Sequence, residues 1–323
     1  MFIPELSALS GVEWAEFVIL VAGTLLVLAG IVNLTVHARW SDALKLKLPE
    51  RLGLPGTDVI FILLLFLLMP SFFHSLIGYF APAESITTTA VATRPTTAAS
   101  DENGFGNRDS DVDGGDSNES GQLSLNPKRS AVANFLAQLT AIVVIVAILR
   151  SRRRDGVSGL GLGVDRLPLR VGQAFVGYLA VWPICAGLLH VSLVVFVELG
   201  IEEEIRQHSA IVLLAESTDR LLKILTVLSA VLLAPILEEL VFRGVLYRML
   251  CDRLGSAWPA AVVSGCAFGL IHFPSPQTVP PLIVLGIALS WIYTRTGSLL
   301  VPILLHAIFN GKTVLWLFLG DAP

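Results

Sequence analysis

Residues 221–237 read LLKILTVLSAVLLAPIL and lead without interruption into Glu238-Glu239-Leu-Val-Phe-Arg243. A helix needs about 20 apolar residues to cross the hydrocarbon core of a bilayer, where unpaired backbone groups are too costly for an open conformation. This run is therefore predicted to be a transmembrane helix, with its polar residues at the cytoplasmic end.

The same apolar pattern recurs along the chain. Hydrophobic residues make up 54% of the 323 residues and charged residues 15%, which excludes an ordinary water-soluble enzyme. The other apolar runs are residues 17–36, 59–80, 131–149, 173–197, 258–271, 282–293 and 299–319. The sequence predicts an all-α, polytopic membrane protein with about eight transmembrane helices, of which the sixth and seventh are the shortest.

Composition divides the chain into four parts. Residues 1–83 hold two transmembrane helices, residues 129–220 hold two more with their loops, and residues 221–320 hold the polar residues considered below. Residues 84–128 are rich in Thr, Ser, Gly, Asn and Asp, and are predicted to be a disordered acidic loop, because they offer little apolar surface to bury. Lys and Arg gather after the first and third runs, which predicts that these loops are cytoplasmic and both termini external.

The charge balance limits the partners. The chain has 22 Lys and Arg against 26 Asp and Glu, a formal net charge of −4, so it has no basic surplus to neutralise phosphates. We expect no nucleic acid partner. Membrane lipid is the expected surroundings, and the cell membrane the expected location.

Ionisable residues at membrane depth are costly unless they are paired or hydrated, so each is a candidate for function. Glu239 and Arg243 are four residues apart with the acid first, the favourable order for an ion pair on a helix. Glu238 is rotated by about 100° from Glu239 and has no such partner. Glu239 is predicted to be structural and Glu238 to be available, although a helix end whose acids face water would explain both.

Two further pairs show the same spacing of four. Phe268 precedes His272, so the ring can pack beneath the imidazole, and His306 precedes Asn310 within the last apolar run. Each pair also has a structural explanation. A histidine beside Pro274 at a helix end is often interfacial, and polar side chains in a span can simply hydrogen bond between helices.

Together, an acid, two histidines and an amide on three helices supply what hydrolysis of a peptide bond needs. A carboxylate and an imidazole can remove a proton from water, and a second imidazole and an amide can stabilise the developing oxyanion. Glu238, His272 and His306 could instead hold a zinc ion with an open position for that water. The sequence leaves both routes open, with Zn²⁺ or no cofactor.

The segments Glu238-Glu239-Leu-Val-Phe-Arg243, Phe268-Gly-Leu-Ile-His272 and His306-Ala-Ile-Phe-Asn310 resemble the EExxxR, FxxxH and HxxxN motifs of the CPBP family of intramembrane proteases. That family includes type II CAAX prenyl endopeptidases and bacteriocin-processing relatives. The resemblance covers roughly residues 221–319.

The resemblance implies specific roles and a substrate class. It implies that Glu238 and His272 activate water and that His306 and Asn310 stabilise the oxyanion. Glu239, Arg243 and Phe268 would support them. The expected activity is an intramembrane endopeptidase, metal-dependent or not, that cleaves a hydrophobic or lipidated substrate, including a prenylated CAAX-type one. The alternative is a non-catalytic immunity, scaffold or carrier protein that uses the same polar cavity.

One expectation conflicts with this reading. Counting along the predicted spans places Glu238 near the inner face of the membrane and His272 towards the outer end of its helix. The two must nevertheless converge for hydrolysis. Shortened helices and the prolines after His272 could bring them together, since irregular backbone is tolerated where protein surrounds it.

Overall fold

The computed structural model describes residues 11–36, 46, 48–49, 51–80, 127–152, 158–201, 205 and 209–319, and within them every regular element is a helix. The N-terminal helices are α1 (Gly11–Val36), α3 (Gly56–Phe80), α4 (Pro127–Arg152), η2 (Ser158–Leu160), α5 (Leu167–Glu198) and α6 (Ser209–Glu216). They are followed by α7 (Arg220–Leu228), η4 (Ser229–Leu233), α8 (Ala234–Glu239), η5 (Leu240–Tyr247) and α9 (Arg248–Leu254). The last are α10 (Ala257–Leu270), η6 (Pro276–Thr278), α11 (Val279–Thr296) and α12 (Leu300–Leu319).

Seven helical segments of the described chain are long and apolar enough to cross a membrane. The predicted sixth span corresponds to α10, which has 14 residues and is shorter than the others, so the number eight is not confirmed. The predicted class of an all-α, multi-pass membrane protein is confirmed. The predicted loop of residues 84–128 lies outside the described residues, apart from Pro127 and Lys128, which begin α4.

The fifth span is longer than its apolar run predicts. Elements α7 to α9 form one continuous helix of 35 residues, Arg220–Leu254, so Glu238 lies near its middle and not at its end. The prediction that placed the polar residues at the end of this helix is therefore wrong. The helix continues because its polar residues are covered by neighbouring helices, with Glu239 and Arg243 fully buried.

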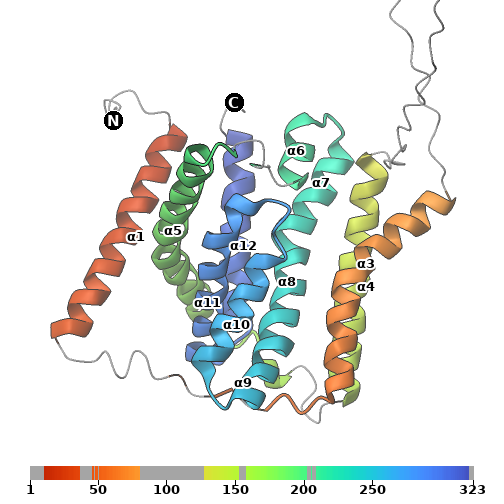
Figure 1. The fold of residues 1–323 in the computed structure, drawn as a ribbon, viewed down its shortest axis with the longest axis horizontal. Coiled ribbons are helices and arrows are strands. Elements are labelled where there is room, and N and C mark those ends of the chain that lie inside the picture. Colours follow the sequence, from red (N-terminus) through yellow and green to blue (C-terminus); the bar gives the residue numbers. More distant parts are fainter. Residues whose placement is uncertain are drawn as a thin grey trace, which may run out of the picture.

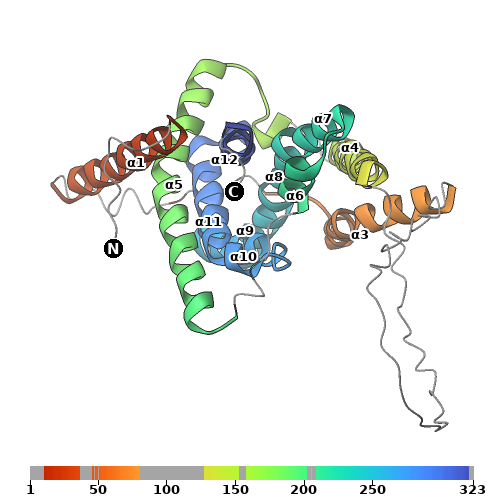
Figure 2. The same ribbon diagram turned by 90° about the horizontal axis from the view of Figure 1, so that it is seen from above.

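The helices run roughly side by side, with α1 at one edge and α3 and α4 at the other (Figure 1). Seen from above, α5, α11, α12 and the long helix α7–α9 lie at the centre, and α1 lies outside α5 (Figure 2). The hydrophobic core is built largely from α5, η5, α10, α11 and α12. The short helix α6 lies at the same end of the bundle as the C-terminal end of α12 (Figure 1).

Helices α10 and α11 approach closely because glycines line their contact. A Cβ on Gly265 would lie 2.8 Å from the backbone nitrogen of Ile287, and one on Gly269 would lie 2.9 Å from that of Ile283. Only residues without a side chain allow the two backbones to come this near, as in other membrane helix pairs. The close contact fixes the end of α10, where Phe268 lies, and with it the following turn, which carries His272.

Candidate active site

Two π-helical segments, η4 and η5, flank the α-helical turn that carries Glu238 and Glu239. Pro235 stands at the start of this turn and has no N–H to donate to the preceding turn. Such π-helical insertions are frequent at functional sites, because they rotate the side chains that follow. The acidic pair therefore lies on a locally irregular stretch of helix in the middle of the bundle.

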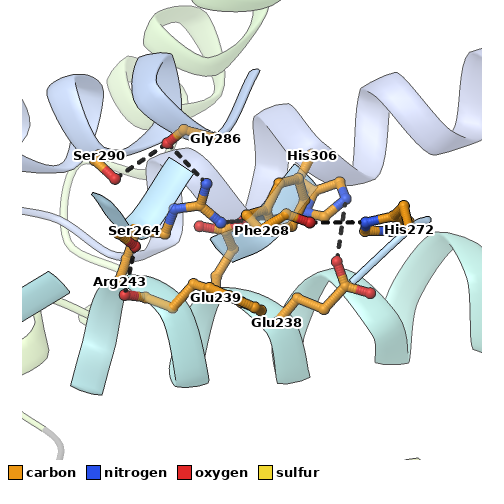
Figure 3. A network of polar contacts seen from close by, with 10 residues as sticks. Glu238, Glu239, Arg243, Ser264, Phe268, His272, Gly286, Ser290 and His306 are labelled. Carbon is orange, nitrogen blue, oxygen red and sulfur yellow. Dashed lines mark hydrogen bonds and ion pairs between the residues drawn. The ribbon is translucent and has the colours of Figure 1, made fainter. Parts of the chain in front are cut away.

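Glu239 and Arg243 form the ion pair that their spacing predicts. Arg243 Nη1 donates to Glu239 Oε1 at 2.8 Å, and both side chains are fully buried. The other terminal nitrogen, Arg243 Nη2, donates to the carbonyl of Gly286 at 2.9 Å, and the guanidinium lies over the ring of Phe268, 4.6 Å from its centroid. This pair ties the long helix to α10 and α11 (Figure 3).

His306 is held between the two carboxylates. Its Nδ1 lies 3.0 Å from Glu239 Oε1, and its Nε2 lies 3.8 Å from Glu238 Oε2. Because an ionised carboxylate only accepts, the contact with Glu239 places a proton on Nδ1 and turns Nε2 toward Glu238. Glu239 Oε1 thus accepts hydrogen bonds from both Arg243 and His306, so this one oxygen connects the two side chains (Figure 3).

His272 is oriented by Phe268. A carbonyl oxygen only accepts, so His272 Nδ1 donates to the carbonyl of Phe268 at 2.9 Å. This hydrogen bond does not use His272 Nε2, which can accept a hydrogen bond from another group. The two ring centroids lie 5.2 Å apart, as the spacing of four predicts. Phe268 is fully buried and also packs edge-on against His306, with centroids 5.6 Å apart, so one ring braces both imidazoles.

Glu238, His272, His306 and Asn310 line a single cavity of about 340 Å³. The conflict between the positions expected for Glu238 and His272 is thereby resolved, because the long helix places Glu238 in mid-bundle. Glu238 Oε2 is buried and has no hydrogen-bond partner in the described protein. Most of the remaining wall is apolar and includes Trp182, Leu189, Ile211, Leu214, Leu282 and Phe309.

Asn310 already uses one of its donors. Its Nδ2 donates to the backbone carbonyl of Ala230 at 2.9 Å, across from α12 to η4. An amide nitrogen carries two hydrogens, so one N–H and the side-chain oxygen remain. Sequence reasoning missed this contact, since nothing in the residue pattern marks the Ala230 carbonyl as free.

The zinc alternative requires three ligands around one point. Among the described residues, no group of three His, Cys, Asp or Glu side chains is arranged to hold a metal ion. The predicted set of Glu238, His272 and His306 does not meet this requirement, and the metalloprotease interpretation is not supported.

Comparison with known proteins finds a family match for the segment that carries this site. Residues 220–311 match the family model "Type II CAAX prenyl endopeptidase Rce1-like". An "Uncharacterized 24.3 kDa protein" of Escherichia coli is 34% identical over 86 residues, which are 26% of this chain and 40% of that protein. The "Putative membrane peptidase YdiL" of Bacillus subtilis (strain 168) is 26% identical over 91 residues, 28% of this chain and 36% of that protein.

The matched segments span 40% and 36% of the lengths of the two relatives, less than half of either protein. No solved structure matches the chain. Residues 220–311 carry an Rce1-like domain, as the three motifs in the sequence indicate.

Proposed function

We propose, starting from the Rce1-like domain at residues 220–311, that the chain is an intramembrane endopeptidase. The observation that supports this most directly is the state of Glu238. One oxygen of its carboxylate is buried without a hydrogen-bond partner and lies 3.8 Å from His306 Nε2, in the same cavity as His272 and Asn310. An unpartnered carboxylate in a cavity at membrane depth is costly, and a water or a substrate group would satisfy it.

Hydrolysis would begin with a water held between Glu238 and His272 Nε2. Glu238 takes a proton from this water as its oxygen attacks the carbonyl carbon of the scissile bond. The carbonyl oxygen gains the negative charge, and His306 Nε2–H in the protonated ring and the second N–H of Asn310 donate to it. Glu238 then passes its proton to the leaving amine nitrogen, and one water has been added across the bond.

Glu239, Arg243 and Phe268 support this chemistry without touching the substrate. Glu239 fixes the direction of His306, and Arg243 keeps the Glu239 carboxylate in place through a bond of 2.8 Å. Phe268 holds His272 by its carbonyl and both imidazoles by its ring. Fixed orientation of this kind removes the reorganisation that the reacting groups would otherwise undergo.

The cavity favours a hydrophobic substrate. Beyond Glu238 and the two histidines, no ionisable side chain other than the Cys185 thiol is among the described residues that line it. A charged substrate side chain would lose its hydration here without gaining a partner. We propose a hydrophobic peptide that enters from the membrane, with or without a lipid such as a C-terminal prenyl group.

A cleavage experiment tests this proposal. Purified protein in vesicles would be given apolar peptides, with and without a farnesylated C-terminal cysteine, and new termini would be read by mass spectrometry. Replacing a general base typically lowers the rate by roughly 10²–10⁴-fold, so Glu238→Gln and His272→Ala should each lose most of the cleavage. Matched controls are the exposed Glu198→Gln and His190→Ala on α5, which should cleave at the wild-type rate.

Two results would contradict the proposal. Cleavage at the wild-type rate by Glu238→Gln would remove its assigned role. If no peptide is cleaved while partner binding is the same in wild type and Glu238→Gln, the non-catalytic immunity, scaffold or carrier function would be favoured.

A further inference from the structure

The carbonyl of Ala230 has no backbone donor from the turn that follows it. In an α-helix it would accept from the N–H of Ala234, but that N–H donates to Ser229, five residues back. In a π-helix it would accept from residue 235, which is Pro235 and has no N–H. The change of register and the proline together leave this carbonyl without a backbone donor, in a residue that lines the cavity.

The side chain of Asn310, in α12, supplies the donor that the backbone lacks. Its Nδ2 lies 2.9 Å from the Ala230 oxygen, a good hydrogen-bond distance. This contact also decides which way the amide faces. Only the nitrogen can donate to a carbonyl, so the NH₂ group faces η4 and cannot exchange places with the side-chain oxygen without losing the bond.

We propose that Pro235 is a positioning residue for Asn310. By withholding an N–H, it keeps the Ala230 carbonyl free, and the free carbonyl holds the Asn310 amide in one orientation beside Glu238. The second N–H of Asn310 is then presented in a fixed direction within the cavity. The catalytic part of this inference rests on the proposed function, because it assumes that this N–H stabilises an oxyanion.

Substituting Pro235 should undo the arrangement in either helical register. In Pro235→Ala, the new N–H donates to Ala230 if the π register persists. If the helix returns to the α register, the N–H of Ala234 donates to Ala230. In both cases the carbonyl gains a backbone donor, and Asn310 loses its exclusive partner.

A double-mutant cycle on thermal stability tests this coupling without any substrate. We expect Asn310→Leu to lower the unfolding midpoint in detergent, because it leaves the Ala230 carbonyl unpaired. In the Pro235→Ala background the same substitution should lower the midpoint by a smaller amount. The control is Pro70→Ala, a proline inside α3 away from the cavity, which should leave the effect of Asn310→Leu unchanged.

An equal loss of midpoint in the wild-type and Pro235→Ala backgrounds would overturn the proposal. Failure of Asn310→Leu to accumulate as folded protein in both backgrounds would also overturn it, since Pro235→Ala should rescue folding.

Activity adds a second readout. We expect Pro235→Ala to lower kcat by roughly tenfold to a hundredfold with little change in KM, as for a misplaced reacting group. The double variant with Asn310→Leu should be no slower than Asn310→Leu alone. If the reductions in kcat of the two single variants instead multiply in the double variant, the positioning role of Pro235 is refuted. If no variant and no wild-type protein cleaves, the proposed function fails, while the stability cycle still decides the coupling.

Discussion

Glu238 and Glu239 are neighbours in the chain, yet their carboxylates meet different surroundings. Glu239 accepts from Arg243 and His306 in a buried network, whereas Glu238 lines the cavity and one of its oxygens has no hydrogen-bond partner. A rotation of about 100° per residue separates these environments. The structure thus agrees with the sequence in assigning the ion pair to Glu239, and the proposed proton transfer to Glu238 stays a prediction.

At Glu239 we predict a loss of stability. The substitution Glu239→Gln removes the negative charge that compensates the buried Arg243. Breaking a buried ion pair in this way typically lowers the free energy of unfolding by about 3–5 kcal/mol. The unfolding midpoint in detergent should fall strongly. The matched control is Glu238→Gln, because the Glu238 carboxylate lies 3.8 Å from His306 Nε2 and does not contact Arg243, so this variant should keep a midpoint near that of wild type. Equal losses in the two variants would show that Glu239 is not the structural acid.

At the scale of single elements, the sequence predicted the helices well and the long fifth span poorly. The apolar run ends at Leu237, and hydropathy alone cannot tell that the helix continues to Leu254. It continues because other helices, and not lipid, surround its polar residues, and because Glu239 and Arg243 neutralise each other. The contacts between residues spaced by four could be predicted from the sequence, because helical geometry places such residues on the same face.

Contacts between distant elements were not readable in this way. The bond from Asn310 to Ala230 depends on the register change in η4, and the bond from His306 to Glu239 depends on how α12 docks. Neither a local pattern nor hydropathy encodes these docking geometries. The three motifs nevertheless predicted which residues would gather, because their polar side chains are costly anywhere except in a shared, protein-lined cavity.

At the contact between α10 and α11, we predict that adding a single methyl group to a glycine lowers the stability of the protein. Gly269→Ala would place its Cβ within 2.9 Å of the Ile283 backbone, so the helices must separate, at a typical cost of about 1–3 kcal/mol. The shift would also move His272, and both midpoint and cleavage rate should fall. Gly187→Ala in α5 is the control, since a Cβ there meets nothing within 4 Å. A Gly269→Ala protein as stable as the control would argue against close packing.

For the whole molecule, the Rce1-like domain is only one part, and α1 lies outside it at the edge of the bundle (Figure 2). Helix α1 packs on α5 with Gly23 close to the backbone of Leu179. Lys312 of α12 donates to Glu16 of α1 at 2.6 Å and lies over the ring of Trp182 at 4.0 Å. Because Trp182 also lines the cavity, this ion pair connects α1 with the wall of the candidate active site.

We predict that Lys312 holds α1 against the bundle. In Lys312→Met the amide protons of α1 should exchange faster with solvent deuterium, because its polar attachment is lost, while those of α10 and α11 should not change. Lys223→Met on α7 is the control, since Lys223 also lies over an aromatic ring, that of Phe318, at 5.6 Å. Unchanged exchange in α1 would mean that packing of α1 on α5 alone holds the helix.

The orientation of the bundle in the membrane stays a prediction. Most of the basic residues on which it rests lie outside the described residues. The reaction that we propose does not depend on it, because the four proposed catalytic side chains line the cavity whichever face is cytoplasmic.

The most direct measurement is the set of initial cleavage rates for wild type, Glu238→Gln, His272→Ala and the double variant on one apolar peptide in the same vesicles. If both residues act on one water, each single variant loses most of the rate, and the double variant is no slower than the slower single variant. Single variants that cleave as fast as wild type, or losses that multiply in the double variant, would contradict a shared hydrolytic site.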